Sequence, residues 1–341
     1  MPALPTSASP TVVRAPEARR DHHRPGGGFR NPWTEPSDAV DVARAARWMA
    51  GRIVSRRKAT ATPRLDLTPA DLRAPGSGVR ATWLGHASVL LQGPGTAVLI
   101  DPVFSDRVSP FSFAGPKREV VLPVAPAGLP PVDTVLVTHD HYDHLDVASV
   151  RFLNGRDRPL FVCPLGVAAW LRATLGRDVR VAELDWWDAV DLPGGVCAVA
   201  TPTKHFAGRG ATNRDGTLWC GYHLTFPDGT VVYNVGDTGA APVFAEVRDR
   251  LPAAGLAVVP IGAYLPRWFM ARVHVDPVGA LDLFETVGAR EMMAAHWGTF
   301  DLADEPLDEP PRLLLAEAER RGLTGRVHVL PVGGQIGARA L

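Results

Sequence analysis

The feature that most constrains this chain is a run of clustered histidines and aspartates, Thr138-His139-Asp140-His141-Tyr142-Asp143-His144. The apolar run Thr134–Val137 precedes it, so the cluster is predicted to lie on a turn leaving the end of a strand. Grouped imidazoles and carboxylates must be hydrated, paired or metal-bound, and both groups are zinc ligands. Alternate residues of an extended segment point the same way, so His139 and His141 can share one ion. Asp143 and His144, on the following turn, can reach a second ion; the alternative is a polar surface loop.

Three further candidate ligands lie at equivalent places, each just beyond the end of a predicted strand: His205, Asp237 and His296. The strands in question are Val196–Ala200, Thr230–Val235 and Glu291–Ala295. A single histidine after a strand is usually a satisfied core residue. Because loops at one edge of a rigid sheet commonly assemble a site, three residues placed alike favour a shared metal site.

From about residue 79 onward, short apolar runs bounded by Gly, Pro and Asp predict strands. Besides those already named, the runs are Val79–Leu84, Val89–Leu91, Ala97–Ile100, Leu160–Val162, Leu218–Phe226, Leu256–Ile261 and Arg326–Leu330. Helices are predicted between them, at about Ala148–Phe152, Gly166–Thr174, Pro242–Arg250, Pro277–Thr286 and Pro311–Arg321. Many strands with helices inserted in both halves predict an α/β/β/α sandwich, two sheets face to face with helices outside.

The N-terminal region differs in composition from the rest. Residues 1–30 are rich in Pro, Ala, Arg and Gly, which predicts a disordered tail in which His22 and His23 are solvated. Residues 31–341 form the catalytic domain in this prediction, and they include an N-terminal helix at about 38–54. That helix is expected to dock on the main body, with contact to a lipid surface as the alternative.

Composition narrows the function classes. Formal net charge is zero, so no overall field attracts nucleic acid or an anionic membrane. Three cysteines without short spacing argue against a disulfide framework and against a cysteine-based zinc site. The N-terminus has no signal pattern, and no apolar run approaches the ~18 residues of a membrane-spanning helix. A cytoplasmic location is expected.

The chain resembles a known family at several points. The His-x-His-x-Asp-His run, the later His, the Gly-Asp and the last His are similar to the metallo-β-lactamase superfamily. Other motifs resemble the branch that includes N-acyl-phosphatidylethanolamine-hydrolysing phospholipase D: Asn31-Pro32-Trp33, Trp83-Leu84-Gly85-His86-Ala87-Ser88, Asp101-Pro102-Val103-Phe104-Ser105, Gly115-Pro116-Lys117-Arg118, Pro266-Arg267-Trp268-Phe269-Met270, His274-Val275-Asp276-Pro277 and His296-Trp297-Gly298-Thr299-Phe300. This resemblance covers about residues 30 to 335 and implies a four-layer α/β/β/α sandwich of two mixed sheets.

The resemblance also implies a ligand set. One zinc ion would be held by His139, His141 and His205. A second would be held by Asp143, His144 and His296, and Asp237 would bridge the two. Manganese or iron are the alternative metals. A bridging water would be a hydroxide near neutral pH, since bound zinc lowers its pKa from 15.7 to about 7. Asp143 would also orient this nucleophile.

Residues outside the ligand set are also candidates. His274 is predicted to hydrogen-bond the scissile group or protonate the leaving oxygen; the alternative is that it orders the start of the helix at Asp276. The aromatic stretch Tyr264–Met270 is predicted to wall an apolar pocket or to pack in the core. His86 and Asp101 are expected near the site, with His86 in a supporting or structural role. His223 and His328 are expected in the core.

The leading hypothesis is therefore a binuclear hydrolase of a phosphodiester, acting on a small-molecule or lipid-like substrate. The alternative on the same fold is hydrolysis of a lactone, β-lactam or thioester. Two other classes, an iron redox protein and a non-catalytic binding module, fit the complete ligand set less well. Nucleic acid is not expected as a partner, whereas peripheral contact with a membrane is compatible with the basic N-terminal helix.

Overall fold

The computed structural model describes residues 10–15, 20–33, 41–54, 61–210 and 213–341. One sheet is built from β2 (Val79–Gly85), β3 (Ser88–Gly93), β4 (Thr96–Ile100), β5 (Thr134–Leu136), β6 (Leu160–Pro164), β7 (Val181–Leu184) and β15 (Gln335–Ala338). Its strand order is β15-β2-β3-β4-β5-β6-β7. Because β2 to β4 pair antiparallel and β4 to β7 pair parallel, this sheet is mixed.

The other sheet is built from β1 (Val12–Val13), β8 (Ala189–Leu192), β9 (Val196–Thr201), β10 (Gly221–Thr225), β11 (Val231–Asn234), β12 (Leu256–Pro260), β13 (Glu291–Ala295) and β14 (Val327–His328). These strands are ordered as they occur along the chain. The pairs from β8 to β11 are antiparallel and those from β11 to β14 are parallel, so this sheet is mixed too.

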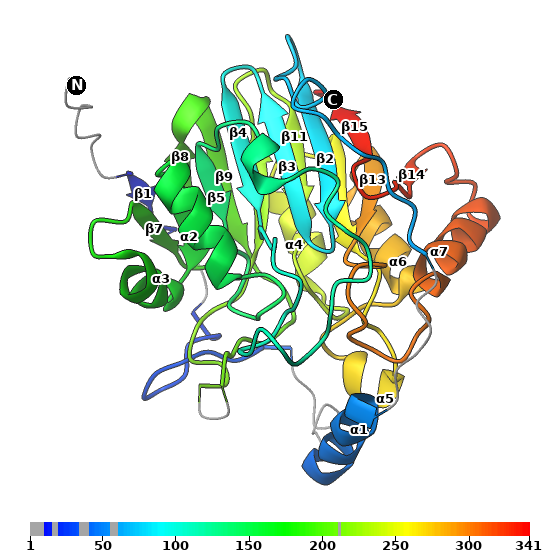
Figure 1. Ribbon diagram of the computed structural model, residues 1–341. Coiled ribbons are helices and arrows are strands. Elements are labelled where there is room, and N and C mark those ends of the chain that lie inside the picture. Colours follow the sequence, from blue (N-terminus) through cyan, green and yellow to red (C-terminus); the bar gives the residue numbers. More distant parts are fainter. Residues whose placement is uncertain (1–9, 16–19, 34–40, 55–60, 211–212) are drawn as a thin grey trace.

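Helices cover the outer faces of both sheets. They are α2 (Val147–Arg156) and α3 (Val167–Leu175) on the first sheet, and α4 (Val243–Arg250), α6 (Pro277–Val287) and α7 (Glu309–Arg320) on the second. Figure 1 shows α2 and α3 on the left flank and α7 on the right. The predicted four-layer α/β/β/α sandwich of two mixed sheets is confirmed.

Strand β3 shows how the sequence divides the core. Val89 and Leu91 point into the core between the sheets, whereas Leu90 points into the core under α2 and α3. All three side chains are 0% exposed. Since successive strand residues face opposite sides, a strand buried on both faces reads as a continuous apolar run. This is why the predicted strands appeared as runs rather than as alternating patterns.

The described N-terminal segments, 10–15 and 20–33, pack against the body, contrary to the prediction of a disordered tail. Residues 1–9 and 16–19 of that predicted tail lie outside the described residues. Val12–Val13 pair antiparallel with β8. His22 is 0% exposed, its ring lies 4.1 Å from that of Trp186, and its Nε2 is 2.7 Å from Asp185 Oδ1. His23 Nε2 lies 2.8 Å from Asp185 Oδ2. The prediction that this pair is solvated is therefore wrong: a buried carboxylate distant in sequence binds both rings.

Helix α1 (Val42–Val54) ends where predicted but begins later. The Asp41 carboxylate accepts a hydrogen bond from the Arg44 amide at 2.9 Å, as a residue that caps a helix does. The predicted start, at about residue 38, lies outside the described residues. No helix within the described ranges has the length and apolar character needed to cross a bilayer.

Two histidines expected in the core differ from each other. His223 is buried, and its Nε2 lies 2.8 Å from the Pro252 carbonyl oxygen. His328 is instead part-exposed at the end of the second sheet, with Nε2 2.8 Å from Glu291 Oε2. Its prediction as a core residue is wrong because β14 is a short edge strand that leaves one face open.

Candidate metal centre

Seven strands position the residues of the candidate site. In the first sheet β2, β4 and β5 run in one direction, and in the second β9, β11, β12 and β13 do so. The carboxyl end of each of these strands leads into a loop at one edge of the sandwich. Every candidate ligand follows such an end, so side chains far apart in sequence meet there.

The turn after β5 is held by Asp101, which follows β4. Its Oδ1 accepts from the Thr138 amide at 2.8 Å, and its Oδ2 accepts from the Thr138 hydroxyl at 2.6 Å. Asp101 Oδ2 also lies 2.7 Å from His144 Nδ1. A buried carboxylate accepting three hydrogen bonds fixes the position of the whole cluster.

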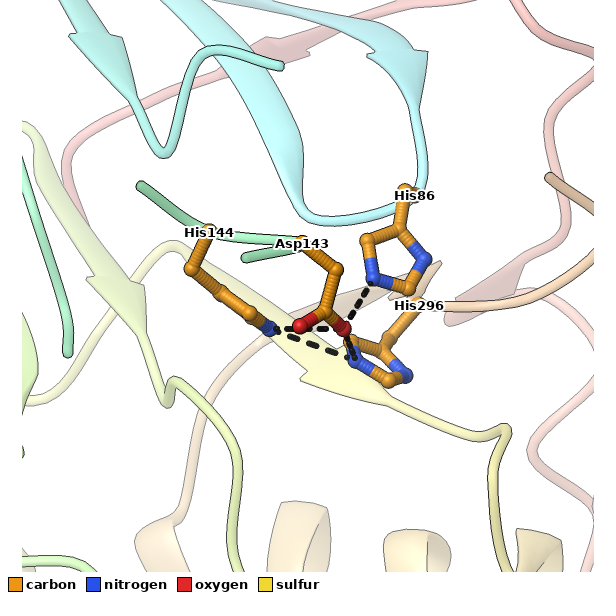
Figure 2. A group of neighbouring side chains, drawn as sticks. All are labelled: His86, Asp143, His144 and His296. Carbon is orange, nitrogen blue, oxygen red and sulfur yellow. Dashed lines mark hydrogen bonds and ion pairs between the residues drawn. The ribbon is translucent and has the colours of Figure 1, made fainter. Parts of the chain in front are cut away.

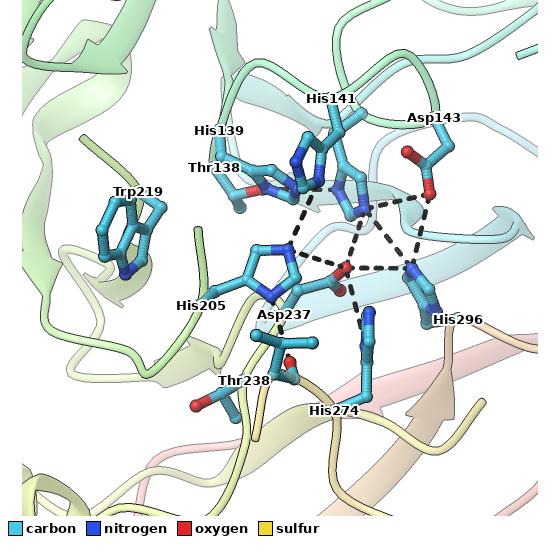
Figure 3. Close-up of polar contacts among 12 residues, drawn as sticks. Thr138, His139, His141, Asp143, His205, Trp219, Asp237, Thr238, His274 and His296 are labelled. Atoms are coloured by element: carbon cyan, nitrogen blue, oxygen red, sulfur yellow. Dashed lines mark hydrogen bonds and ion pairs between the residues drawn. The ribbon is translucent and has the colours of Figure 1, made fainter. Parts of the chain in front are cut away.

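The first donor set consists of His139, His141 and His205 (Figure 3). His141 Nδ1 lies 2.8 Å from His139 Nε2 and 3.3 Å from His205 Nε2. His205 Nδ1 donates to the Val273 carbonyl at 3.0 Å, so its Nε2 carries a lone pair. Thr138 Oγ1, whose proton goes to Asp101, accepts from His139 Nδ1 at 3.0 Å, which leaves a lone pair on His139 Nε2 as well. Two lone pairs turned to one ring nitrogen fit a shared cation.

The second donor set consists of Asp143, His144 and His296, with His86 beside it (Figure 2). Asp143 Oδ2 lies 3.6 Å from His144 Nε2 and 3.7 Å from His296 Nε2, and these two nitrogens are 3.4 Å apart. His144 Nδ1 donates to Asp101, which leaves Nε2 as the ring nitrogen that faces Asp143 and Asp237. Burial lowers the pKa of His144, but the charges of Asp237, Asp143 and Asp101 together outweigh burial and raise this pKa well above its usual value. His86 Nε2, 2.9 Å from Asp143 Oδ2, donates to that carboxylate.

Asp237 lies between the two sets, as Figure 3 shows. Its Oδ2 is 3.1 Å from His296 Nε2, 3.2 Å from His144 Nε2 and 3.8 Å from His205 Nε2. The preceding Gly236 has φ +69°, and a Cβ there would come within 2.8 Å of the Cys220 carbonyl. Only glycine fits that turn, which carries Asp237 from β11 into the site.

The histidines of the site differ in the direction in which their pKa is shifted. Burial lowers the pKa of His139 well below its usual value, that of His141 to about 4 and that of His205 to about 3. Burial also lowers the pKa of His296, but the Asp237 charge and the hydrogen bonds to Asp143 and Asp237 together outweigh burial and raise this pKa to about 9. Burial raises the pKa of Asp237, yet His296 and His144 hold it well below its ordinary value. A cation at this end is therefore favoured, and the donor set of imidazoles and carboxylates fits zinc.

His274 lies beside both sets. Its Nδ1 is 3.9 Å from Asp237 Oδ2, and its ring centroid is 5.1 Å from that of His205. The side chain is buried, and Nδ1 has no hydrogen-bond partner among the described residues. Burial lowers its pKa to about 3, so the imidazole is neutral. The start of α6 is capped by Asp276, whose Oδ1 accepts from the Gly279 amide at 2.8 Å, so the helix does not need His274.

The stretch Tyr264–Met270, predicted as a pocket wall or core, contains the short helix α5 (Arg267–Met270). Met270 and Phe269 belong to an apolar cluster with Trp48 and Ala303. Tyr264 is buried, and its hydroxyl donates to Glu309 Oε1 at 2.5 Å. These contacts support the packing alternative and join α1 to the edge of the site.

Backbone strain at the site has no signal in the sequence. His86, Asp101 and His296 have φ of 51°, 41° and 61°, in the left-handed region that side chains rarely adopt. Such residues persist where their surroundings hold them, and they gather at functional sites. Asp140, inside the motif, points elsewhere: its carboxylate accepts from the Gly208 amide at 2.7 Å and from the Thr217 hydroxyl at 2.9 Å.

Comparisons with known proteins agree with the fold. Residues 96–297 match the family described as "Beta-lactamase superfamily domain". An uncharacterized protein of Mycobacterium tuberculosis is 36% identical over 335 residues, covering 96% of this chain and 87% of that protein. N-acyl-phosphatidylethanolamine-hydrolyzing phospholipase D 1 of Caenorhabditis elegans is 37% identical over 249 residues, covering 71% of this chain and 70% of that protein.

Among solved structures, isothiocyanate hydrolase from Delia radicum gut bacteria has a TM-score of 0.62 at 20% identity, covering 76% of this chain and all of that one. At this identity the likeness establishes the fold. The family match spans more than half of the chain, and the resemblance expected from the sequence motifs is confirmed. Together with its cluster of candidate ligands at the shared edge of two sheets, this places the chain in the metallo-β-lactamase superfamily of metal-dependent hydrolases.

Proposed function

We propose that this protein is a binuclear hydrolase that cleaves a phosphodiester in a lipid-like substrate, with zinc as its metal. One ion would be held by His139, His141 and His205, and the other by Asp143, His144 and His296. The observation that carries the proposal is the position of Asp237, whose Oδ2 approaches nitrogens of both sets within 3.1 to 3.8 Å. One carboxylate oxygen shared in this way suits two adjacent cations.

When bound, two zinc ions would act as Lewis acids and lower the pKa of a coordinated water to about 7. The protein's own groups prepare that chemistry. Asp101 and the Val273 carbonyl accept hydrogen bonds from Nδ1 of His144 and of His205, so that Nε2 of each ring is the nitrogen that would bind metal. His86 donates to Asp143 and thereby aims its carboxylate, which would orient the attacking water.

His274 would contact the substrate. Its neutral ring lies next to Asp237, and its buried Nδ1 lacks a protein partner in the described part of the chain. An imidazole in this state can donate a hydrogen bond to the scissile group or to the leaving oxygen. A buried polar atom left unpaired costs about 1–3 kcal/mol, which a bound substrate would recover.

The choice of a phosphodiester rests on the relatives. The Caenorhabditis elegans protein, 37% identical, is named for hydrolysis of N-acyl-phosphatidylethanolamine, a lipid phosphodiester. A yeast mitochondrial protein with the same named activity is 33% identical over 257 residues. Two adjacent cations also suit in-line displacement at phosphorus, because they stabilise both the attacking and the leaving oxygen.

The test begins with protein purified without added metal. Elemental analysis should find about two zinc ions per chain, and iron instead would contradict the metal assignment. The same protein is then assayed with bis(p-nitrophenyl) phosphate, N-acyl-phosphatidylethanolamine, a lactone, a β-lactam and a thioester. Hydrolysis confined to the carbonyl substrates would refute a phosphodiesterase. Asp237→Asn should abolish activity, whereas Asp191→Asn, at an exposed position of β8, should retain it.

A further inference from the structure

Two residues of the first histidine motif, Asp140 and Tyr142, are not candidate ligands, and both contact the loop that carries His205. We call residues 205–210 and 213–217 the His205 loop. Asp140 is 2% exposed, and its Oδ1 accepts a hydrogen bond from the Gly208 amide at 2.7 Å. Its Oδ2 accepts from the hydroxyl of Thr217, which is also buried, at 2.9 Å. One buried carboxylate therefore binds this loop at two points.

Arg209 of the His205 loop makes the corresponding contacts to the motif. Its Nη1 donates to the carbonyl oxygens of Asp140 and Leu145 at 2.9 and 2.6 Å. Its own carbonyl accepts from the Tyr142 hydroxyl at 2.7 Å. The guanidinium carbon lies 4.1 Å from the centre of the Tyr142 ring and 4.7 Å from that of the Trp170 ring. A guanidinium held between two aromatic rings and bonded to two carbonyls has little freedom to move.

These contacts connect the two sheets at the first donor set. The motif follows β5 of the first sheet, whereas His205 follows β9 of the second. His205 lies opposite His139 and His141, as Figure 3 shows. A designed site functions only when its groups are held within about 0.5 Å of the required geometry. Asp140, which stands between His139 and His141 in the chain, is thus placed to fix the distance from these two rings to His205.

Folding alone does not account for a carboxylate at position 140. A carboxylate is costly to bury, and an apolar side chain of similar size often serves a folded core equally well. Both oxygens of Asp140 are engaged with donors of the His205 loop rather than with the end of a strand or helix. The position of that loop is therefore what this buried carboxylate controls.

We infer that Asp140 is a positioning residue of the first donor set: its carboxylate holds the His205 loop against the motif, so that His205 reaches the ion that His139 and His141 share. This inference rests on the proposed function, because it presupposes the two ions. It assigns the affinity for one of them to a residue that binds neither. The second donor set has separate support from Asp101 and His86, so its ion should not depend on Asp140.

The test measures zinc binding by equilibrium dialysis against buffered free zinc. Asp140→Ala should weaken one ion at least tenfold and leave the other as in wild type, since losing a residue that supports a ligand typically costs about 10–100-fold in metal affinity. Asp140→Asn should keep both affinities within about threefold, because its amide can accept from Gly208 and donate to the Thr217 hydroxyl oxygen. The inference is overturned if Asp140→Ala binds both ions like wild type, if it weakens both equally, or if asparagine restores nothing.

A second variant tests the same contact if Asp140→Ala does not fold. Thr217→Val removes only the hydroxyl that donates to Asp140, and it should weaken the same ion at least threefold. Thr134→Val is the matched control, because Thr134 is fully buried in β5 and its hydroxyl has no hydrogen-bond partner among the described residues. This control should change either affinity less than twofold. Equal effects of the two valine substitutions would overturn the inference.

Crystals of Asp140→Ala or Thr217→Val, at a free zinc concentration that fills only the stronger site, identify the weakened ion. Anomalous scattering should place the remaining zinc beside Asp143, His144 and His296; zinc beside His139 and His141 instead would overturn the inference. None of these measurements depends on hydrolysis. A protein that binds both ions as expected but cleaves no phosphodiester would therefore refute the proposed function and leave the role of Asp140 standing.

Discussion

Replacing Asp101 by asparagine should weaken one of the two proposed metal ions selectively. Asp101 is 1% exposed, and its Oδ2 accepts from His144 Nδ1 at 2.7 Å. An asparagine amide placed there presents N–H groups to His144 Nδ1. The ring would then carry its proton on Nε2, the atom that faces Asp143 and Asp237. A protonated Nε2 cannot bind a metal.

The magnitude follows from two independent routes. Removing a partner that orients a metal-binding histidine typically weakens metal affinity about 10–100-fold, or about 1.4–2.7 kcal/mol. Losing a buried hydrogen bond to a charged group costs about 1.5–3 kcal/mol. The two ranges agree. Asp101 reaches the first donor set indirectly, through the amide and hydroxyl of Thr138, so the ion of that set should be affected much less.

The assay is equilibrium dialysis against a series of buffered free zinc concentrations, followed by elemental analysis. Wild type and Asp191→Asn should each bind two ions per chain. Asp101→Asn should bind one ion as before and the other about 10–100-fold more weakly, with unchanged circular dichroism. If both ions weaken equally, or neither does, Asp101 does not act through the tautomer of His144.

Four further outcomes are expected. His274→Gln should lower kcat at least tenfold with unchanged zinc content, measured on bis(p-nitrophenyl) phosphate; a change in KM alone would contradict contact with the reacting group. Stripping metal with a chelator should lower the melting temperature, because the facing lone pairs and carboxylates lose their cations, and returning zinc should restore it. Asp185→Asn should reduce stability near pH 7. Burial raises the pKa of Asp185, but the hydrogen bonds and charges of His22 and His23 outweigh burial and hold this pKa below its usual value of 3.8. The contribution of Asp185 to the free energy of unfolding is therefore complete above pH 3.8 and is lost as pH falls through the lower pKa of the folded state. Urea unfolding should show that the stability difference between Asp185→Asn and wild type is smaller at pH 3 than at pH 7. Binding to anionic vesicles should weaken in the double variant Phe111→Ser, Phe113→Ser, whose aromatic rings are 55% and 79% exposed; equal binding would exclude this surface.

The parts of the fold that could be predicted from sequence are those with local causes. Strand β12 and the end of β5 are buried on both faces, so each appears as an apolar run with no alternation. Asp276-Pro277 starts α6 as expected, since the carboxylate caps the helix and proline has the required φ. The candidate ligands follow such runs, so their positions along the chain already indicated that they lie together at one edge of the sheets.

The sequence could not predict features that depend on contacts between residues far apart along the chain. Strand β8 has only four residues, and β15 includes Gly337, so neither shows a strong strand pattern. The contact between His22 and Asp185 joins positions 163 residues apart, and a proline- and glycine-rich segment gave no sign of it. The bond from His86 to Asp143 depends in the same way on a turn with an unusual backbone, which only the packed structure reveals.

Buried strands and loops contribute differently to the site. Asp101 and His296 hold left-handed backbone conformations, each costing about 1–3 kcal/mol. Such strain persists only where surroundings are rigid. Here Asp101 follows directly on the fully buried strand β4, and His296 follows β13, which is buried except for its first residue. The proposed metal chemistry thus depends on the sheets. The cleft beside His205 is instead lined by the segment 20–33 and by loops. No lining residue of that cleft other than His205 belongs to the two donor sets, so substitution of the other lining residues should leave those sets in place.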